Sequence, residues 1–406
     1  MLYRLEIENF HSIRDKQVID LRLPSRSHAW PERFAPIFKG AKTIAPKVIA
    51  LFGPNASGKS NILRALAFLA WFLKGSFHYT KSGFPLTRFQ DEGAAKLPVR
   101  LAIELGGRTE LSTNPKMHQE SVRFGLYRYE LELLPHSGFV DTVGFEALWH
   151  KPDGTGKWKR VFERRSGDTL LGSKTFPLSG LQQITDTIRS DASVVATLAL
   201  FNHEPSKFIQ MTADSIISNL LIERVEPTDR EVFEFLASNS ELFIALNKEI
   251  RRIDLGVDNI SIVISSAGPT LMFKHAGLDV EMPWHTESHG TRMFVKIFPW
   301  IFMAMQKGGI ALIDELDLAI HPLILPEVLR WFYDPVRNPS NAQLWMTCHS
   351  TSLMDDLVKE EIVLTEKDRQ GRTKAYSLMD MEGLRRDDNL YRKYMGGVYG
   401  AVPGIG

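Results

Sequence analysis

The sequence predicts an α/β fold with a mostly parallel core sheet, an antiparallel β region and a helical insertion. A short apolar run at residues 48–52 leads through a glycine-rich loop into a helical pattern at residues 59–73. Alternating apolar and polar runs occupy residues 99–163, and helical spacing of apolar residues dominates from about 178 to 255. A second buried strand, residues 310–313, then returns the chain to the core.

Composition narrows the classes of protein to which this chain can belong. The chain has 406 residues, a formal net charge of +1 and one cysteine, Cys348, so it forms no intramolecular disulfide and no zinc ribbon. Apolar runs such as residues 297–305 fall short of the roughly 20 residues of a membrane span, and no signal-peptide pattern opens the sequence. We therefore expect a cytoplasmic protein with no membrane partner. The near-zero charge gives no global basic field for nucleic acid.

The chain divides into four predicted segments. They are a first core part at 1–98, an antiparallel β region at 99–177, a helical insertion at 178–256 and a second core part at 257–406. Four prolines within residues 24–46 predict a connecting loop, and apolar spacing predicts a helix across residues 209–221. No heptad repeat is sustained, which argues against long coiled-coil arms.

The strongest motif is a phosphate-binding loop, Gly53-x4-Gly58-Lys59-Ser60, placed between a strand and a helix. Glycines let the backbone wrap a phosphate, so that N–H groups and the helix N-terminus point at the anion. The lysine reaches the β- and γ-phosphates and the serine hydroxyl ligates Mg²⁺. A simple glycine-rich turn is the weaker alternative. The predicted nucleotide-binding residues are Asn55, Ala56, Ser57, Gly58, Lys59, Ser60 and Asn61.

A second motif follows the apolar strand at residues 310–313. Asp314 lies where a core strand delivers a carboxylate to Mg²⁺, and Glu315 lies where a carboxylate can activate water. Alone, this pattern favours a strand before a solvated turn; beside a phosphate loop, it favours the catalytic interpretation. Asp317 is interpreted as a cap of the next helix. His349 ends another strand and is a candidate donor to the γ-phosphate.

A third stretch, residues 287–292, precedes an apolar helix at residues 293–305. A serine and a glycine at a helix N-terminus can form an anion site. Taken alone, Ser288 is better interpreted as an ordinary helix cap.

Taken in order, these motifs resemble those of the ABC-type ATPase head of SMC, RecF and OLD-like proteins. Residues 53–60 are similar to Walker A, and residues 310–315 are similar to Walker B with Glu315 as its catalytic glutamate. His349 is similar to the switch histidine. Residues 318–322 resemble the D-loop, and Gln90 is the candidate Q-loop residue.

The signature motif of these heads, usually Leu-Ser-Gly-Gly-Gln, is matched only in part. Ser288 and Gly290 agree with it, whereas Glu287, His289 and Thr291 depart from it. The resemblance implies ATP and Mg²⁺ as cofactors, with the metal on Ser60, Asp314 and Gln90. It also implies that Ser288, His289 and Gly290 contact the nucleotide of a second subunit.

The chain also resembles standalone bacterial ATPases of the abortive-infection and RloA type. This implies a homodimer of heads that hydrolyses ATP and controls a protein effector encoded nearby, in antiphage defence. The alternative is a DNA-repair or chromosome-handling ATPase of the RecF or SMC kind. Missing coiled coils and missing net basicity count against that alternative, so nucleic acid is the less supported partner. A nuclease domain does not fit into residues 350–406, and none is expected.

Overall fold

The computed structural model describes residues 1–25, 30–79, 84–111, 123–135, 141–221, 226–253, 256–266, 268–319, 324–384 and 388–403. Its elements surround a central six-stranded sheet in the order β12-β16-β17-β6-β18-β19. The strands are β6 (Val48–Phe52), β12 (Ile216–Ser218), β16 (Ile310–Ile313), β17 (Gln343–Thr347), β18 (Ile362–Lys367) and β19 (Thr373–Ser377). All neighbours are parallel except β18 and β19. The predicted mostly parallel core is therefore confirmed.

A second, antiparallel sheet has seven strands in the order β11-β10-β9-β8-β7-β1-β2. Its strands are β1 (Leu2–Glu8), β2 (Gln17–Asp20), β7 (Val99–Arg108), β8 (Phe124–Leu134), β9 (Thr142–Pro152), β10 (Lys159–Arg165) and β11 (Leu171–Gly172). The first two strands of the chain thus join the predicted antiparallel region in one sheet.

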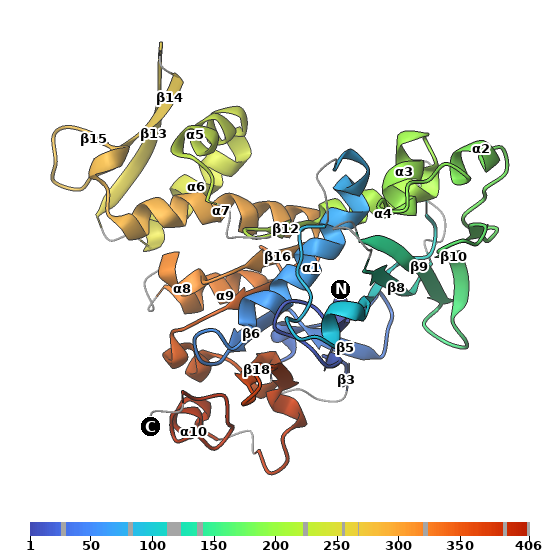
Figure 1. Ribbon diagram of the computed structural model, residues 1–406. Coiled ribbons are helices and arrows are strands. Elements are labelled where there is room, and N and C mark those ends of the chain that lie inside the picture. Colours follow the sequence, from blue (N-terminus) through green and yellow to red (C-terminus); the bar gives the residue numbers. More distant parts are fainter. Residues whose placement is uncertain are drawn as a thin grey trace.

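Helix α1 (Lys59–Gly75) lies between the two sheets, near the centre of Figure 1. Along β6, Ile49 and Leu51 face α1, whereas Val48, Ala50 and Phe52 pack in the opposite core. This alternation follows from the two-residue period of a strand. The α1 side also holds α3 (Val194–Leu200) and α4 (Glu204–Asp214), and the other side holds α7 (His289–Lys307) and α9 (Leu325–Tyr333).

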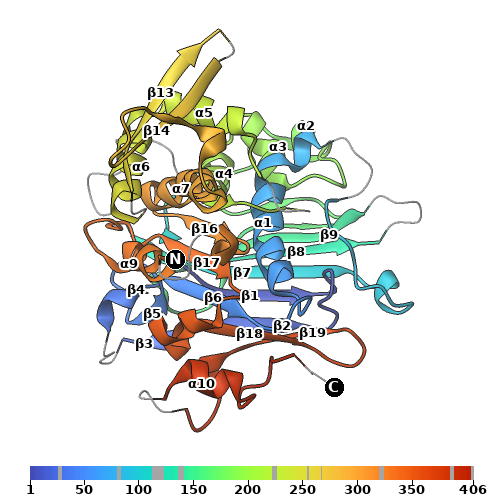
Figure 2. The same cartoon turned by 90° about the vertical axis from the view of Figure 1, so that its left-hand side faces the viewer.

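A third unit projects beyond α7, as Figures 1 and 2 both show. It consists of α5 (Asp229–Ser238), α6 (Ser240–Ile253) and the sheet of β13 (Val257–Ser265), β14 (Gly268–His275) and β15 (Met282–Pro283). Three short helices complete the described chain: α2 (Gln182–Thr185), α8 (Leu316–Ala319) and α10 (Leu390–Met395).

Two expectations about local structure are wrong. Residues 24–46, predicted as a loop, contain a small sheet of β3 (Leu23–Pro24), β4 (Phe34–Pro36) and β5 (Thr43–Pro46). Pro24 and Pro36 lie on the edge strands β3 and β4, where a missing N–H is tolerated, and Pro46 is the last residue of the central strand β5.

The predicted helix across residues 209–221 ends at Asp214, and β12 follows it as an edge strand of the core sheet. Two β-branched residues, Ile216 and Ile217, favour this extended conformation. Gly309 makes room for the change, because a Cβ there would lie 2.0 Å from the Ser215 carbonyl oxygen.

Candidate functional site

The phosphate loop joins β6 to α1 in a conformation that requires glycine. Gly53 and Gly58 have φ values of +150° and +108°. A Cβ on Gly53 would lie 2.2 Å from the Thr365 carbonyl oxygen, and one on Gly58 would lie 2.3 Å from Thr373 Oγ1. Because the loop lies tightly against β18 and β19 and both glycines have positive φ, a residue with a side chain does not fit at either position.

Lys59, the first residue of α1, is 5% exposed. Its Nζ donates to the carbonyl oxygens of Gly53 at 2.9 Å and Pro54 at 3.1 Å, and burial lowers the pKa of this lysine. The ammonium group is thus held inside the loop by weak acceptors, which phosphate oxygens can replace.

The two acids follow β16, as predicted, and Thr347 at the end of β17 joins them. The buried Thr347 hydroxyl donates to Asp314 Oδ1 and accepts from the Glu315 N–H, both at 2.7 Å. Ser60 Oγ donates to the same Asp314 oxygen at 2.8 Å. Glu315 has a φ of +54°, an uncommon value for a residue with a side chain. The hydroxyl of Thr347 therefore holds the Asp314 carboxylate and the main chain of Glu315 in this turn.

Asn219, just past β12, holds the main chain of Asp314 from the other side. The Asp314 N–H donates to Asn219 Oδ1 at 2.8 Å, and Asn219 Nδ2 donates to the Asp314 carbonyl at 3.1 Å. Asn219 is fully buried, so this pair of hydrogen bonds forms away from water.

His349 lies two residues past β17, with Nε2 at 3.7 Å from Glu315 Oε1. Its turn is held by Asp317, whose Oδ2 accepts from the N–H groups of His349 and Ser350, both at 2.8 Å. This corrects the interpretation of Asp317 as a helix cap, because α9 has Ile324 at its N-cap position and no side-chain cap. Asp317 instead positions the histidine beside the catalytic candidate.

These groups surround a cavity of about 490 Å³. Its lining residues are Asn55, Ala56, Ser57, Gly58, Lys59, Ser60, Asn61, Arg64, Glu315, Leu318 and His349. The structure therefore brings together every predicted nucleotide-binding residue and both catalytic candidates. Most of the predicted D-loop, residues 320–322, lies outside the described residues.

The residues present fit a Mg²⁺ ion in part. A hydroxyl and a carboxylate oxygen, from Ser60 and Asp314, converge at 2.8 Å, and hard oxygen donors of this kind suit Mg²⁺. Gln90 does not join them: its exposed side chain donates to the Arg88 carbonyl at 2.8 Å and lies outside the cavity lining. Within the described ranges, no cluster of three or more His, Cys, Asp or Glu side chains offers another metal site.

The signature-like stretch lies apart from this cavity, at the start of α7. Ser288 caps the helix, because its Oγ accepts from the Thr291 N–H at 3.0 Å. Ser288, His289 and Gly290 are all exposed. The preceding Glu287 is buried, with Oε1 at 2.6 Å from His275 Nε2 on β14. The structure thus shows the cap and leaves the same three residues accessible from outside.

A family model described as "AAA domain, putative AbiEii toxin, Type IV TA system" matches residues 48–355, a span from the start of β6 to beyond His349. The chain belongs to this AAA-domain family. No curated protein matches this chain at a significant level.

Several solved structures are similar to the AAA domain over most of its length. The SMC head domain from Thermotoga maritima is 14% identical, covers 93% of this chain and 98% of its own, and has a TM-score of 0.40. An SmcHead bound to the C-winged helix domain of ScpA is 15% identical, covers 93% of this chain and 98% of its own, and has a TM-score of 0.45. An Smc head with an extended coiled coil, bound to the C-terminal domain of ScpA derived from Pyrococcus furiosus, is 14% identical, covers 93% of this chain and 97% of its own, and has a TM-score of 0.44.

Sequence reasoning missed the groups that hold the phosphate loop of the AAA domain in place. Thr373 Oγ1 donates to the Ser57 carbonyl at 2.8 Å, and the hydroxyls of Ser57 and Thr365 lie 2.6 Å apart. Ser12 accepts from Asn61 Nδ2 at 2.7 Å. These threonines come from strands that follow the loop by more than 300 residues, so no local pattern announces them.

Thr347, in contrast, could have been found from the alternation of side chains along its strand. It follows Trp345 by two residues on a buried strand, so both side chains lie on the face toward α1 and the phosphate loop. A polar residue on that face, at the carboxyl end of a core strand, is a candidate site residue.

Over the part of the chain that the structure describes, none of the helices has the length and apolar character to cross a membrane.

Proposed function

We propose that this AAA domain binds ATP with Mg²⁺ and hydrolyses it to ADP and phosphate, acting as a switch. The observation that carries the proposal is the network in which Thr347 joins Asp314 to Glu315, while Ser60 of the phosphate loop bonds the same aspartate. An acid pair is thus fixed next to a phosphate cradle.

The chemistry follows from these positions. Lys59 and the loop N–H groups bind the β- and γ-phosphates. Glu315 takes the proton of a water whose oxygen bonds to the γ-phosphorus as the bond to the β–γ bridging oxygen breaks. His349, 3.7 Å from Glu315, donates to the phosphate that forms. Ser60 and Asp314 would hold Mg²⁺, which would neutralise charge on the phosphates.

We assign a further donor role at this site to a second copy of the chain. Ser288, His289 and Gly290 are exposed at the N-terminus of a 19-residue helix, where N–H groups and the helix dipole favour an anion. Two chains would then dimerise head to head around ATP, each completing the site of the other.

We further propose that the switch acts in the cytoplasm on a protein effector encoded nearby, in antiphage defence. The family description, which names a toxin and a type IV toxin–antitoxin system, supports such a partner. The test is growth of cells that express the neighbouring gene product with wild-type chain or with Lys59→Ala. Growth that differs between the two supports effector control, and equal growth contradicts it.

The ATPase proposal itself is tested with purified Glu315→Gln protein. ATP binding should persist, while turnover should fall by about 10²–10⁴-fold, because the base is lost and Asp314 remains. Glu360→Gln, at a partly buried acid outside the cavity, is the matched control and should turn over normally. Normal turnover by Glu315→Gln would show that another group activates the water.

A further inference from the structure

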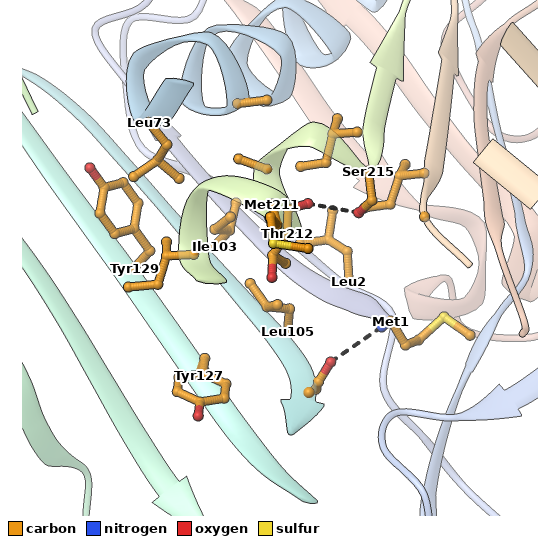
Figure 3. Close-up of a pocket in the computed structure, with 18 of the residues that line it drawn as sticks. Met1, Leu2, Leu73, Ile103, Leu105, Tyr127, Tyr129, Met211, Thr212 and Ser215 are labelled. Atoms are coloured by element: carbon orange, nitrogen blue, oxygen red, sulfur yellow. Dashed lines mark hydrogen bonds between the residues drawn. The ribbon is translucent and has the colours of Figure 1, made fainter. Parts of the chain in front are cut away.

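A second cavity, of about 380 Å³, lies where the antiparallel sheet and the core sheet diverge. Its walls come from α1, α4, β7, β8 and the edge formed by β12 and β16. Figure 3 shows Ile103 and Leu105 of β7 beside Met211 and Thr212 of α4, with Leu73 of α1 above them. The cavity is thus bounded by elements from both halves of the fold.

The lining is mainly apolar, although Lys307 and Arg108 also belong to it. Several of its polar side chains are engaged with protein partners: Tyr129 donates to Glu146 at 2.9 Å, Tyr127 to the Arg108 carbonyl at 2.7 Å, and Lys307 to the Asp214 carbonyl at 3.3 Å. Both ends of the Gln343 amide bond to main-chain groups: its Oε1 accepts from the Leu2 N–H at 2.7 Å, and its Nε2 donates to the Leu2 carbonyl at 2.9 Å. What remains for an occupant is mainly hydrocarbon surface.

The cavity is open to solvent on one side, where Met211 of its lining is 59% exposed. Its deeper walls are apolar, so moving an apolar molecule from water onto them is favourable. The volume also falls within the range of roughly 300–1,000 Å³ that is usual for ligand pockets.

We propose that this cavity binds a small, neutral, apolar molecule and that its occupancy changes ATP turnover. Leu66 and Leu69 of the lining belong to α1, whose first two residues, Lys59 and Ser60, end the phosphate loop. Leu312 lies two residues before Asp314 on the chain, and Ile216 lies three before Asn219, which holds the Asp314 main chain. The proposal that the cavity binds an apolar molecule is independent of the ATPase function. The proposal that binding changes turnover rests on the proposed ATPase function.

The test uses N-phenyl-1-naphthylamine, a neutral apolar fluorophore, titrated into the purified full chain. Fluorescence should rise and saturate at one probe per chain. Ala213→Phe places a ring into the cavity from α4 and should weaken binding at least about tenfold, since filled volume excludes the probe. Asp214→Phe, the next residue on the same helix but outside the lining, is the matched control and should bind as wild type.

Folding is checked by thermal melting, and Leu105→Phe repeats the test from the opposite wall. Absence of saturable binding, or equal binding by both lining variants and wild type, would overturn the site. Saturating probe should change the wild-type turnover rate at least about twofold and leave Ala213→Phe unaffected, as differential affinity for two states requires. An unchanged wild-type rate would overturn the coupling. Probe binding without any ATP turnover would instead contradict the proposed function and leave the binding site standing.

Discussion

The phosphate-loop side of the site and the signature-like stretch are built in opposite ways. The first draws on β6, β16, β17 and α1, and fixes its polar groups with buried hydrogen bonds centred on Thr347 and Asn219. The second, Ser288 to Gly290, is exposed and held by one local helix cap. The difference teaches that buried hydrogen bonds hold the first region, whereas the second is left accessible; in the proposed dimer, this exposed stretch would form the other side of the site.

The largest effect is expected at Lys59, in the phosphate-loop side of the site. Replacing it with alanine removes the charge that faces the β- and γ-phosphates, so ATP binding should be lost altogether in calorimetric titration. Lys47→Ala is the control, since Lys47 is equally buried, at 4%, and lies outside the cavity. ATP binding by Lys59→Ala at wild-type affinity would contradict the assignment of residues 53–60 as a phosphate-binding loop.

A smaller loss is expected at Thr347. Thr347→Val keeps the shape but removes the Thr347 partner of the Glu315 N–H and leaves Asp314 Oδ1 with the Ser60 hydroxyl alone. Unfolding free energy should fall by about 1–3 kcal/mol, and turnover by about 10–100-fold, as for other partners of metal ligands.

Thr347→Ser retains the hydroxyl and should restore most of the turnover. Chemical denaturation and steady-state ATPase rates measure the two effects. If valine and serine variants turn over alike, the hydroxyl does not position the acids.

The smallest expected effect on stability lies at the signature-like stretch. Ser288→Ala removes the cap of α7, at a cost of about 1 kcal/mol in unfolding free energy. Thr228→Ala removes a comparable cap from α5 and is the matched control. Both variants should lose similar stability, but only Ser288→Ala should also lose turnover. Equal turnover in both would reduce Ser288 to a helix cap.

Local patterns predicted much of the fold and one side of the site. Strands β6 and β16 are continuous apolar runs and helix α1 has apolar residues at helical spacing, with the phosphate loop between β6 and α1. The edge strand β12 was missed, because Ile216 and Ile217 fit a helix as well as a strand until Gly309 admits them beside β16.

The positioning groups were harder to predict for a physical reason. Asn219 reaches Asp314 across 95 residues of chain, and Thr373 reaches Ser57 across 316. Such contacts depend on which strands become neighbours in the sheet, and no spacing in the sequence encodes that order. Gln90 shows the converse: the family resemblance selected it, yet its side chain bonds to Arg88 outside the cavity.

The most direct test of composite sites is mixing of two inactive variants. Lys59→Ala has a broken phosphate loop and an intact Ser288, and Ser288→Arg has the reverse. A mixed dimer would contain one complete site, so ATP turnover should reappear on mixing, once subunit exchange is verified by labelled chains. No recovery, despite verified exchange, would contradict the account and leave each ATP site within a single chain.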